Sequence, residues 1–192
     1  MAAIHRTTMT PTKLELLTGW LPKQSWYAGG PDEPELAIAG GFRLDDPEGA
    51  VGIEFMVVVD TSAPAPVAYL VPLGYRGAAL EGAADEALIG TSEHGVLGTR
   101  WIYDGVHDPV VMARLRALLR GEAVPQHRTI SDTPDPTVVV RGTGPADGLA
   151  VQVNRALRPT EAAQRSPAVL VAGWSWPDGT AVRGVLATLA PS

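Results

Sequence analysis

The chain has 192 residues, with 15 Lys and Arg side chains against 21 Asp and Glu, which gives a formal net charge of −6. This length suits one domain, or one domain with a small appendage, and the 45% hydrophobic and 19% charged content is typical of a folded soluble protein. The acidic balance argues against a nucleic-acid binder. Because the sequence contains no cysteine, disulfides, a thiolate nucleophile and cysteine metal ligands are excluded.

A signal peptide and membrane-spanning segments are not expected. Residues 1–6 contain no apolar run that could form the core of a signal peptide. No stretch of the chain approaches the roughly 20 apolar residues needed to cross a bilayer. We therefore expect a cytoplasmic protein that does not associate with membranes.

The first predicted element is a short amphipathic helix over residues 11–21. Thr10 is expected to cap this helix, with Pro11 at its first position, and Gly19 is expected to end it. Beyond residue 35, segments rich in Val, Ile, Phe and Tyr alternate with turn residues. This pattern predicts consecutive antiparallel strands over residues 36–44, 51–60, 65–73 and 96–103.

A second helix is predicted over residues 110–120, opened by Asp108-Pro109 and stopped by Gly121. Its apolar stripe is expected to consist of Val111, Leu115 and Leu118 or Leu119. Residues 125–136 contain three prolines among Ser, Thr and Asp, a composition typical of a linker. Further short strands are predicted over residues 137–141, 149–153, 168–174 and 181–189.

Three segments resemble motifs of one family. Residues 20–30 (WLPKQSWYAGG) are similar to the "WLPxQRWFAGK" opening of actinobacterial maltokinases, and residues 71–76 (VPLGYR) to the "VPLxYR" strand of their N-terminal cap. Residues 87–105 (LIGTSEHGVLGTRWIYDG, after Ala87), followed by His107-Asp108-Pro109-Val110, resemble the "LIGTxEHSVLGxRWVYDG" segment. These matches occur in family order within residues 14–120.

The resemblance implies an α+β fold in two parts. Residues 1–130 are expected to form a maltokinase N-terminal cap-like domain, a cystatin-like antiparallel sheet with packed helices. Residues 131–192 are expected to form a small β-rich remnant of a kinase N-lobe. In that remnant, residues 149–159 resemble the strand whose lysine holds the nucleotide phosphates, but Gln152 stands at the lysine position. A neutral amide cannot supply that charge, so we expect no kinase activity and no cofactor.

A polar cluster of Glu93, His94, Asp104, His107 and Asp108 offers the ligand types of a metal or acid/base site. Turns and helix caps explain it better, because Asp108 precedes Pro109 and Asp104 precedes Gly105. Ser92, His94 and Asp104 could suggest a nucleophilic triad, but no Gly-x-Ser-x-Gly elbow is present. The sequence therefore predicts turn-and-cap architecture here.

The aromatic residues form the candidate interaction or ligand surface. Trp20, Trp26 and Tyr27 are expected mainly to pin the first helix to the sheet, with partner contact or sugar stacking as alternatives. Trp174 and Trp176 are expected to lie one inside and one near the surface, the outer one being a candidate contact residue. The arginines of the second helix, Arg114, Arg116 and Arg120, are expected to form a solvated face.

The leading hypothesis is a non-catalytic accessory or interaction protein linked to trehalose, maltose or α-glucan metabolism. The resemblance implies that the cap helps to dock maltokinases onto trehalose-synthase-type enzymes. The expected partner is therefore such an enzyme, a sugar kinase, or a second copy of the chain. The alternative is a sensor of a nucleotide or a maltose-like sugar, and a split maltokinase-type subunit is less favoured because of Gln152.

Overall fold

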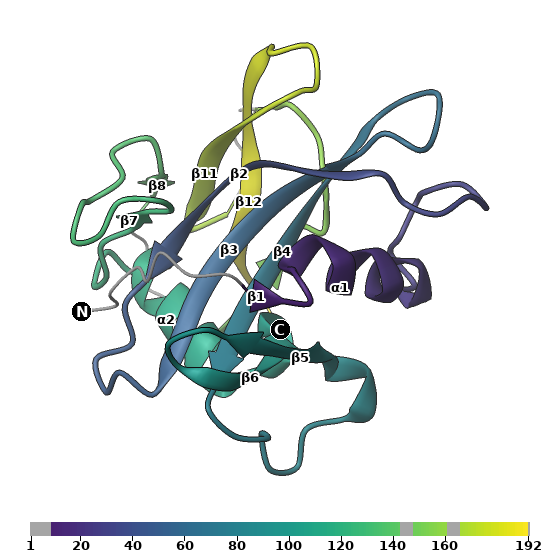
Figure 1. Ribbon diagram of the computed structural model, residues 1–192. Coiled ribbons are helices and arrows are strands. Elements are labelled where there is room, and N and C mark those ends of the chain that lie inside the picture. Colours follow the sequence, from purple (N-terminus) through teal and green to yellow (C-terminus); the bar gives the residue numbers. More distant parts are fainter. Residues whose placement is uncertain (1–8, 143–147, 161–165, 192) are drawn as a thin grey trace.

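The computed structural model describes residues 9–142, 148–160 and 166–191. Within these residues the chain forms an antiparallel sheet of twelve strands and two short α-helices (Figure 1). The predicted α+β, sheet-rich fold class is confirmed. No helix in the described part of the chain is long and apolar enough to span a membrane.

The strands in chain order are β1 (Met9–Thr10), β2 (Leu36–Leu44), β3 (Val51–Asp60), β4 (Val67–Arg76), β5 (Leu88–His94), β6 (Gly98–Asp104), β7 (Gln126–His127), β8 (Val139–Arg141), β9 (Leu149–Val153), β10 (Ala156–Leu157), β11 (Val169–Ser175) and β12 (Ala181–Pro191). The helices are α1 (Lys13–Trp20) and α2 (Pro109–Leu119), with three 3-10 turns, η1 (Leu21–Lys23), η2 (Asp85–Ala87) and η3 (Gly105–His107).

The four strands predicted from the first half of the sequence lie beside one another in the expected order, β2-β3-β4-β6. The bounds of β2 and β3 agree with the predicted ones, since both strands end at turn residues. β5 was not predicted as a strand. It pairs with the far side of β6 and forms a hairpin with it, and β1 pairs with β5 in turn.

The ends of α1 differ from the prediction. Thr12 rather than Thr10 is the N-cap, because Thr12 and Glu15 form a capping box in which each side chain binds the other's backbone N–H. Gly19 does not end the helix, which continues to Trp20 and runs directly into η1. The glycine is exposed, so its missing side chain removes no core contact there.

The second predicted helix is confirmed as α2. Asp108 caps its N-terminus and Pro109 occupies the first turn. Gly121 follows the C-cap with a φ of +75°, the left-handed conformation that ends helices. Its buried side chains are Val111, Leu115, Leu118 and Leu119.

Residues 125–136 do not form the extended linker that their composition predicts. β7 pairs with β2, and the backbone N–H groups of His127 and Asp135 bind the carbonyls of Thr133 and Pro125. The Asp135 carboxylate also accepts from the backbone N–H and the hydroxyl of Thr137. These bonds fold the segment onto the sheet, because polar loop residues can satisfy their own backbone groups.

The strands beyond residue 130 join those before it into a ring, in which the chain from β9 to β10 takes the place of one strand pairing. β11 pairs with β2 at Trp174 and Gly40, and β12 lies between β11 and β9. Three residues after β9, β10 begins and pairs with β4, which closes the ring. The division of the chain into two domains at residue 130 stays a prediction, although both segments contribute to one sheet.

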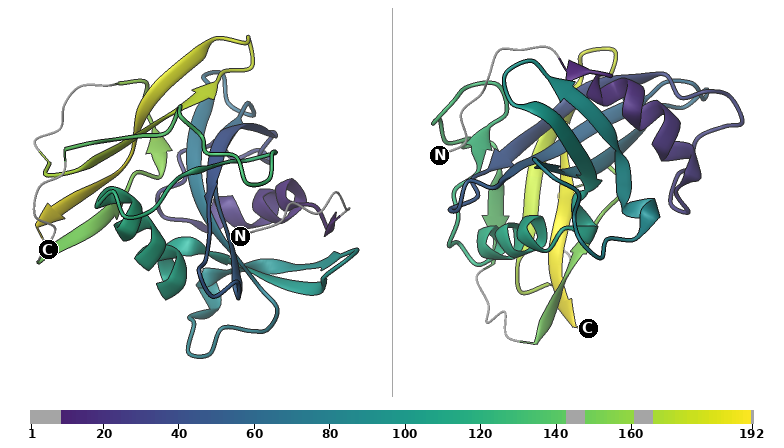
Figure 2. Two further views of the ribbon diagram at one scale, coloured as in Figure 1. Left: turned by 90° about the vertical axis from the view of Figure 1, so that its left-hand side faces the viewer. Right: turned by 60° about the horizontal axis from the view of Figure 1, so that its bottom comes forward.

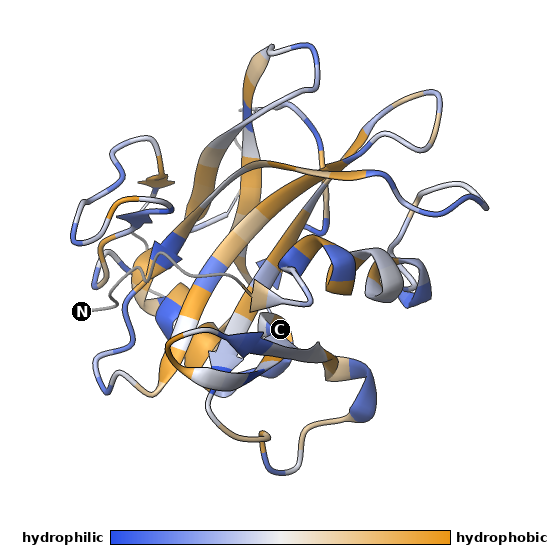
Figure 3. Ribbon diagram, in the orientation of Figure 1, coloured by the Kyte–Doolittle hydropathy of each residue, from blue (hydrophilic) through white to orange (hydrophobic). Residues whose placement is uncertain are grey.

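Two hydrophobic cores lie on the two sides of β3 and β4. The first fills the ring and contains Phe42 stacked on Phe55, with the apolar stripe of α2 and side chains from β11 and β12. The second lies under α1 and contains Leu17, Trp20 and Met56 with residues of β5 and β6. Figure 2 (left) shows α2, β11 and β12 on one side of the central strands and α1 on the other. Burial on both faces explains the nearly continuous apolar sequence of β3, visible in Figure 3.

Candidate functional site

Trp20 and Trp26 belong mainly to the packing of α1 against the sheet. Trp20 is buried, and its Nε1 donates to the carbonyl of Glu86 at 3.2 Å. The Trp26 ring meets Trp20 edge-on, with centroids 5.8 Å apart, and lies 5.9 Å from Tyr69. Trp26 remains half-buried. The core-packing interpretation therefore describes the contacts of both residues.

Tyr27 anchors the chain after η1 to the end of β3. Its hydroxyl donates to Asp60 Oδ2 at 2.8 Å, and its ring lies 5.6 Å from Tyr69. Burial, then the hydrogen bond to Asp60, raises the pKa of Tyr27 to about 12. Burial acts to raise the pKa of Asp60, but hydrogen bonds, including those from the Ser62 and Glu35 backbones and from Tyr27, outweigh it and lower that pKa.

Arg155 is a site residue that the sequence did not reveal. Its guanidinium forms an ion pair with Asp104, whose side chain is 2% exposed, and lies 4.8 Å over the ring of Trp26. The two partners come from the cap motifs at residues 20–30 and 87–105, whereas Arg155 comes from the segment after residue 130. The arginine therefore joins three separate parts of the sequence by charge and by cation–π contact.

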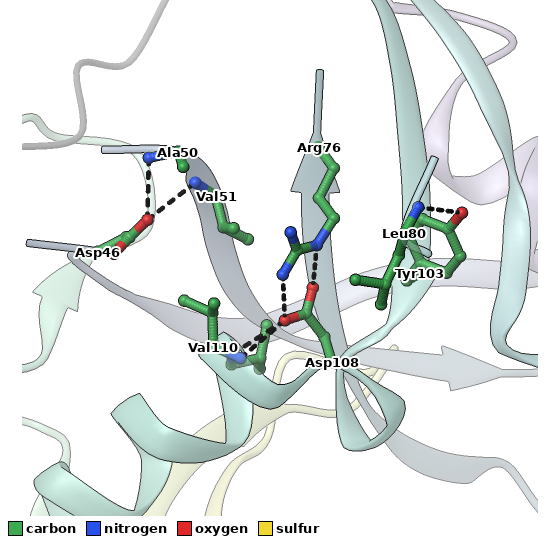
Figure 4. Close-up of polar contacts among 9 residues, drawn as sticks. Asp46, Ala50, Val51, Arg76, Leu80, Tyr103, Asp108 and Val110 are labelled. Atoms are coloured by element: carbon green, nitrogen blue, oxygen red, sulfur yellow. Dashed lines mark hydrogen bonds and ion pairs between the residues drawn. The ribbon is translucent and has the colours of Figure 1, made fainter. Parts of the chain in front are cut away.

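A second arginine joins two of the quoted motifs (Figure 4). Arg76 ends the VPLGYR strand, and its Nε and Nη2 donate to Asp108 Oδ2 and Oδ1 at 2.7 and 2.8 Å. Asp108 Oδ1 also accepts from the backbone N–H of Val110 at 2.9 Å. The hydrogen bond to Asp108 is the largest cause that raises the pKa of Arg76 above its ordinary value. In the same region Tyr103 accepts from the Leu80 N–H, and the Asp46 carboxylate accepts from three backbone N–H groups of its own turn.

The polar cluster does not converge on one point. Glu93 accepts from Thr99, His94 Nδ1 accepts from the backbone N–H groups of Val96 and Leu97, and Ser92 donates to the carbonyl of Pro11. Asp104 caps η3 and Asp108 caps α2. These contacts agree with the turn-and-cap interpretation. Over the ranges that the structure describes, no three His, Asp or Glu side chains form a group that could hold a metal ion.

Trp174 of β11 and Trp176, which follows the end of the strand, pack against the same core, with ring centroids 6.1 Å apart. Trp174 is buried and Trp176 only half-buried, so Trp176 is the outer residue of the pair. Gln152 is exposed on β9, while its neighbours Val151 and Val153 pack against the core. The aromatic candidates thus form two separate groups, and Gln152 belongs to neither.

The tip of the β5–β6 hairpin presents two apolar side chains to solvent. Val96 is 62% exposed and Leu97 is 45% exposed, between Gly95 and Gly98. The tip is held by the bonds to His94 Nδ1 and by a hydrogen bond from Arg100 Nη2 to the Leu97 carbonyl at 2.7 Å. The hairpin extends away from the central strands (Figure 2). An apolar pair between two glycines was the sequence signal that could have indicated this surface.

Comparisons with known proteins relate part of the sequence to one family. A search of curated proteins finds no match for the chain. The model of the maltokinase N-terminal cap domain matches residues 20–108, which run from Trp20 to Asp108. This range contains Trp26, Tyr27, the Arg76–Asp108 pair and the hairpin tip. Over these residues the chain is therefore similar to the maltokinase N-terminal cap domain family.

Proposed function

We propose that the protein is a non-catalytic docking module of the maltokinase cap type, located in the cytoplasm, that binds a trehalose-synthase-type enzyme through its β5–β6 hairpin. The observation that carries the proposal is the exposed pair Val96 and Leu97 on a tip fixed by hydrogen bonds, within the matched residues 20–108. Exposed apolar side chains on an ordered loop are suited to burial against a partner.

The chemistry of the described polar groups supports the same proposal. Two buried carboxylates, those of Asp104 and Asp108, lie near the end of the matched segment. Asp104 forms an ion pair with Arg155 and Asp108 forms one with Arg76, and both accept hydrogen bonds from backbone N–H groups. Tyr27 is engaged by Asp60. Each of these side chains fixes a turn, a helix start or a contact between segments, which is what a rigid docking module requires.

The experiment is a binding measurement on the tip. The immobilised chain is presented with purified trehalose-synthase-type enzyme, and the variants Val96→Asp and Leu97→Asp are compared with the unaltered chain. We expect each tip variant to weaken binding at least about tenfold, because a charge at the centre of an interface is left without water. Both residues are exposed and their tip is held through backbone atoms, so folding is expected to be unchanged.

Val124→Asp is the matched control. Val124 is 58% exposed and lies outside residues 20–108, so its variant is expected to bind like the unaltered chain. If the unaltered chain does not bind the enzyme, or if all three variants lose binding equally, the proposal fails.

A second proposed function is a sensor of a nucleotide or a maltose-like sugar. It is favoured by the exposure of Gln152, which a ligand could reach at the position corresponding to the phosphate-binding lysine. A bound ligand must raise the thermal unfolding temperature of the native state. A rise with any one of ATP–magnesium, maltose or trehalose would support this function, and unchanged unfolding with all three at millimolar concentration would remove it.

A further inference from the structure

One imidazole nitrogen holds the backbone of the β5–β6 hairpin tip. His94 ends β5, and its Nδ1 accepts from the backbone N–H of Val96 at 3.3 Å and from that of Leu97 at 3.1 Å. An imidazole nitrogen accepts hydrogen bonds only while it carries no proton. Both contacts therefore require the neutral form of His94.

Arg100 of β6 adds a cation to the same face of the hairpin. In the register of the two strands, Ser92 stands opposite Arg100 and His94 stands opposite Gly98. Because opposed residues and alternate residues of a strand share a face, the side chains of His94 and Arg100 are diagonal neighbours. Arg100 Nη2 donates to the Leu97 carbonyl at 2.7 Å, which fixes its charge at the tip. A proton on Nδ1 thus removes an acceptor and also places a second cation beside the first.

The other charged side chains on β5 and on the neighbouring elements have partners elsewhere. Met9 of β1, directly opposite His94, carries no charge. The remaining charged residues of β5 and α1 that the structure describes bind as follows: Glu93 with Thr99, Lys13 with Glu54, and Glu15 with Thr12. Arg100 is thus the charged group that faces His94 at the tip.

We propose that protonation of His94 releases the hairpin tip and so makes docking of the protein partner dependent on pH. This inference rests on the proposed docking function, because Val96 and Leu97 are the side chains that the tip presents. Histidine changes charge at an ordinary pKa of about 6.5, so the tip is held at neutral pH and released in mildly acid solution. Gly98 has a φ of +69°, and the glycines on both sides of the pair permit other tip conformations.

The first measurement follows the tip in the free chain. Hydrogen exchange of the Val96 and Leu97 amides is measured by NMR at pH 7.5 and at pH 5.0, as protection relative to an unstructured peptide at the same pH. We expect the protection of both amides to fall at least about fivefold at pH 5.0, because the imidazolium offers them no acceptor. Unchanged protection of the amides of β3 would show that the chain stays folded.

The second measurement is binding of the purified trehalose-synthase-type enzyme at the same two pH values. The unaltered chain is expected to bind at least about tenfold more weakly at pH 5.0. His94→Asn should not share this loss, because Asn Oδ1 is bonded to Cγ as His Nδ1 is and accepts N–H groups without titrating. The difference between the two chains separates His94 from titrating groups of the enzyme. His94→Ala, which has no acceptor, should bind weakly at both pH values.

His127→Asn is the matched control. His127 Nδ1 accepts from the backbone N–H of Thr129 at 3.2 Å, a contact of the same kind at β7, outside the hairpin. This variant should keep the pH dependence of the unaltered chain. Thermal unfolding at both pH values establishes that each variant is folded.

Equal protection of the Val96 and Leu97 amides at the two pH values would overturn the proposal. The same pH dependence of binding in His94→Asn as in the unaltered chain would overturn it as well. A chain that does not bind the enzyme at either pH refutes the docking function instead. The exchange of the tip amides then still decides whether His94 controls the tip.

Discussion

The guanidinium of Arg76 holds both carboxylate oxygens of Asp108, at 2.7 and 2.8 Å, while the same carboxylate caps α2. The end of β4 is thereby fixed to the start of α2 across 32 residues of sequence. The Asp108 side chain is fully buried and that of Arg76 is 19% exposed. This arrangement places the helix that closes the hydrophobic interior of the strand ring.

Arg76→Met should destabilise the fold by roughly 3 kcal/mol, because it leaves a buried carboxylate with only its backbone donors. Arg76→Lys should lose less, since it keeps the charge but not the paired geometry. The free energy of unfolding is measured by urea denaturation. Arg120→Met, which removes an exposed pair with Glu122, is the control and should change it by less than about 1 kcal/mol. Equal stability of Arg76→Met and the unaltered chain would contradict the role of the pair.

Arg155→Met tests the connection between the cap motifs and the later segment. Asp104 loses its buried cationic partner, so a loss of roughly 3 kcal/mol in unfolding free energy is expected. Because Arg155 lies over Trp26, the tryptophan fluorescence of the native state should also change. Arg158→Met provides the comparison at an exposed position and should alter neither quantity. A native spectrum and stability unchanged by Arg155→Met would count against this connection.

The titration of Asp60 should make the free energy of unfolding depend on pH in the acidic range. Its pKa is lower in the folded chain than the ordinary value, so the unfolded chain binds the proton more readily. The stabilisation by Asp60 is therefore complete above the unfolded pKa of about 4 and is lost as the pH falls through the lower folded pKa. Urea denaturation between pH 6 and 2.5 should show a steeper loss for the unaltered chain than for Asp60→Asn. Parallel curves would mean that Asp60 is not responsible.

A chain ending at residue 130 tests whether the two segments fold together. Truncation removes the ring strands that cover Phe42 and Phe55 and contribute Leu170, Trp174 and Leu186 to the same core. We expect the truncated chain to lack a cooperative thermal transition and to bind an apolar dye. A cooperative transition at the temperature of the full chain would instead support the predicted domain boundary at residue 130.

Local patterns in the sequence predicted the local structure well. The bounds of β2 and β3 and the Asp108 cap follow from apolar runs, turn residues and Asp-Pro, which act over a few residues. The start of α1 was misplaced because two threonines flank Pro11, and the capping box of Thr12 with Glu15 decided between them. β5 was missed because Leu88–His94 contains Gly, Ser, Glu and His rather than a strand-like apolar run.

The candidate site depends on contacts that no local pattern contains. Arg155 reaches Asp104 over 51 residues, and Lys13 reaches Glu54 over 41. The pairing register of β3, β4 and β10 decides which cation meets which carboxylate. That register depends on how the strands close into the ring. The residues that carry the family resemblance could be named from the sequence, but their partners beyond residue 130 required the fold.

Competition measures the proposed docking function most directly. A preformed complex of full-length maltokinase with a trehalose-synthase-type enzyme is titrated with this chain, and the bound kinase is quantified. If the chain binds the enzyme at the surface that the kinase uses, it displaces the kinase in a saturable manner. The Val96→Asp variant should then displace the kinase at least about tenfold less effectively. A kinase complex that is unaffected at every concentration of the chain would contradict the docking function.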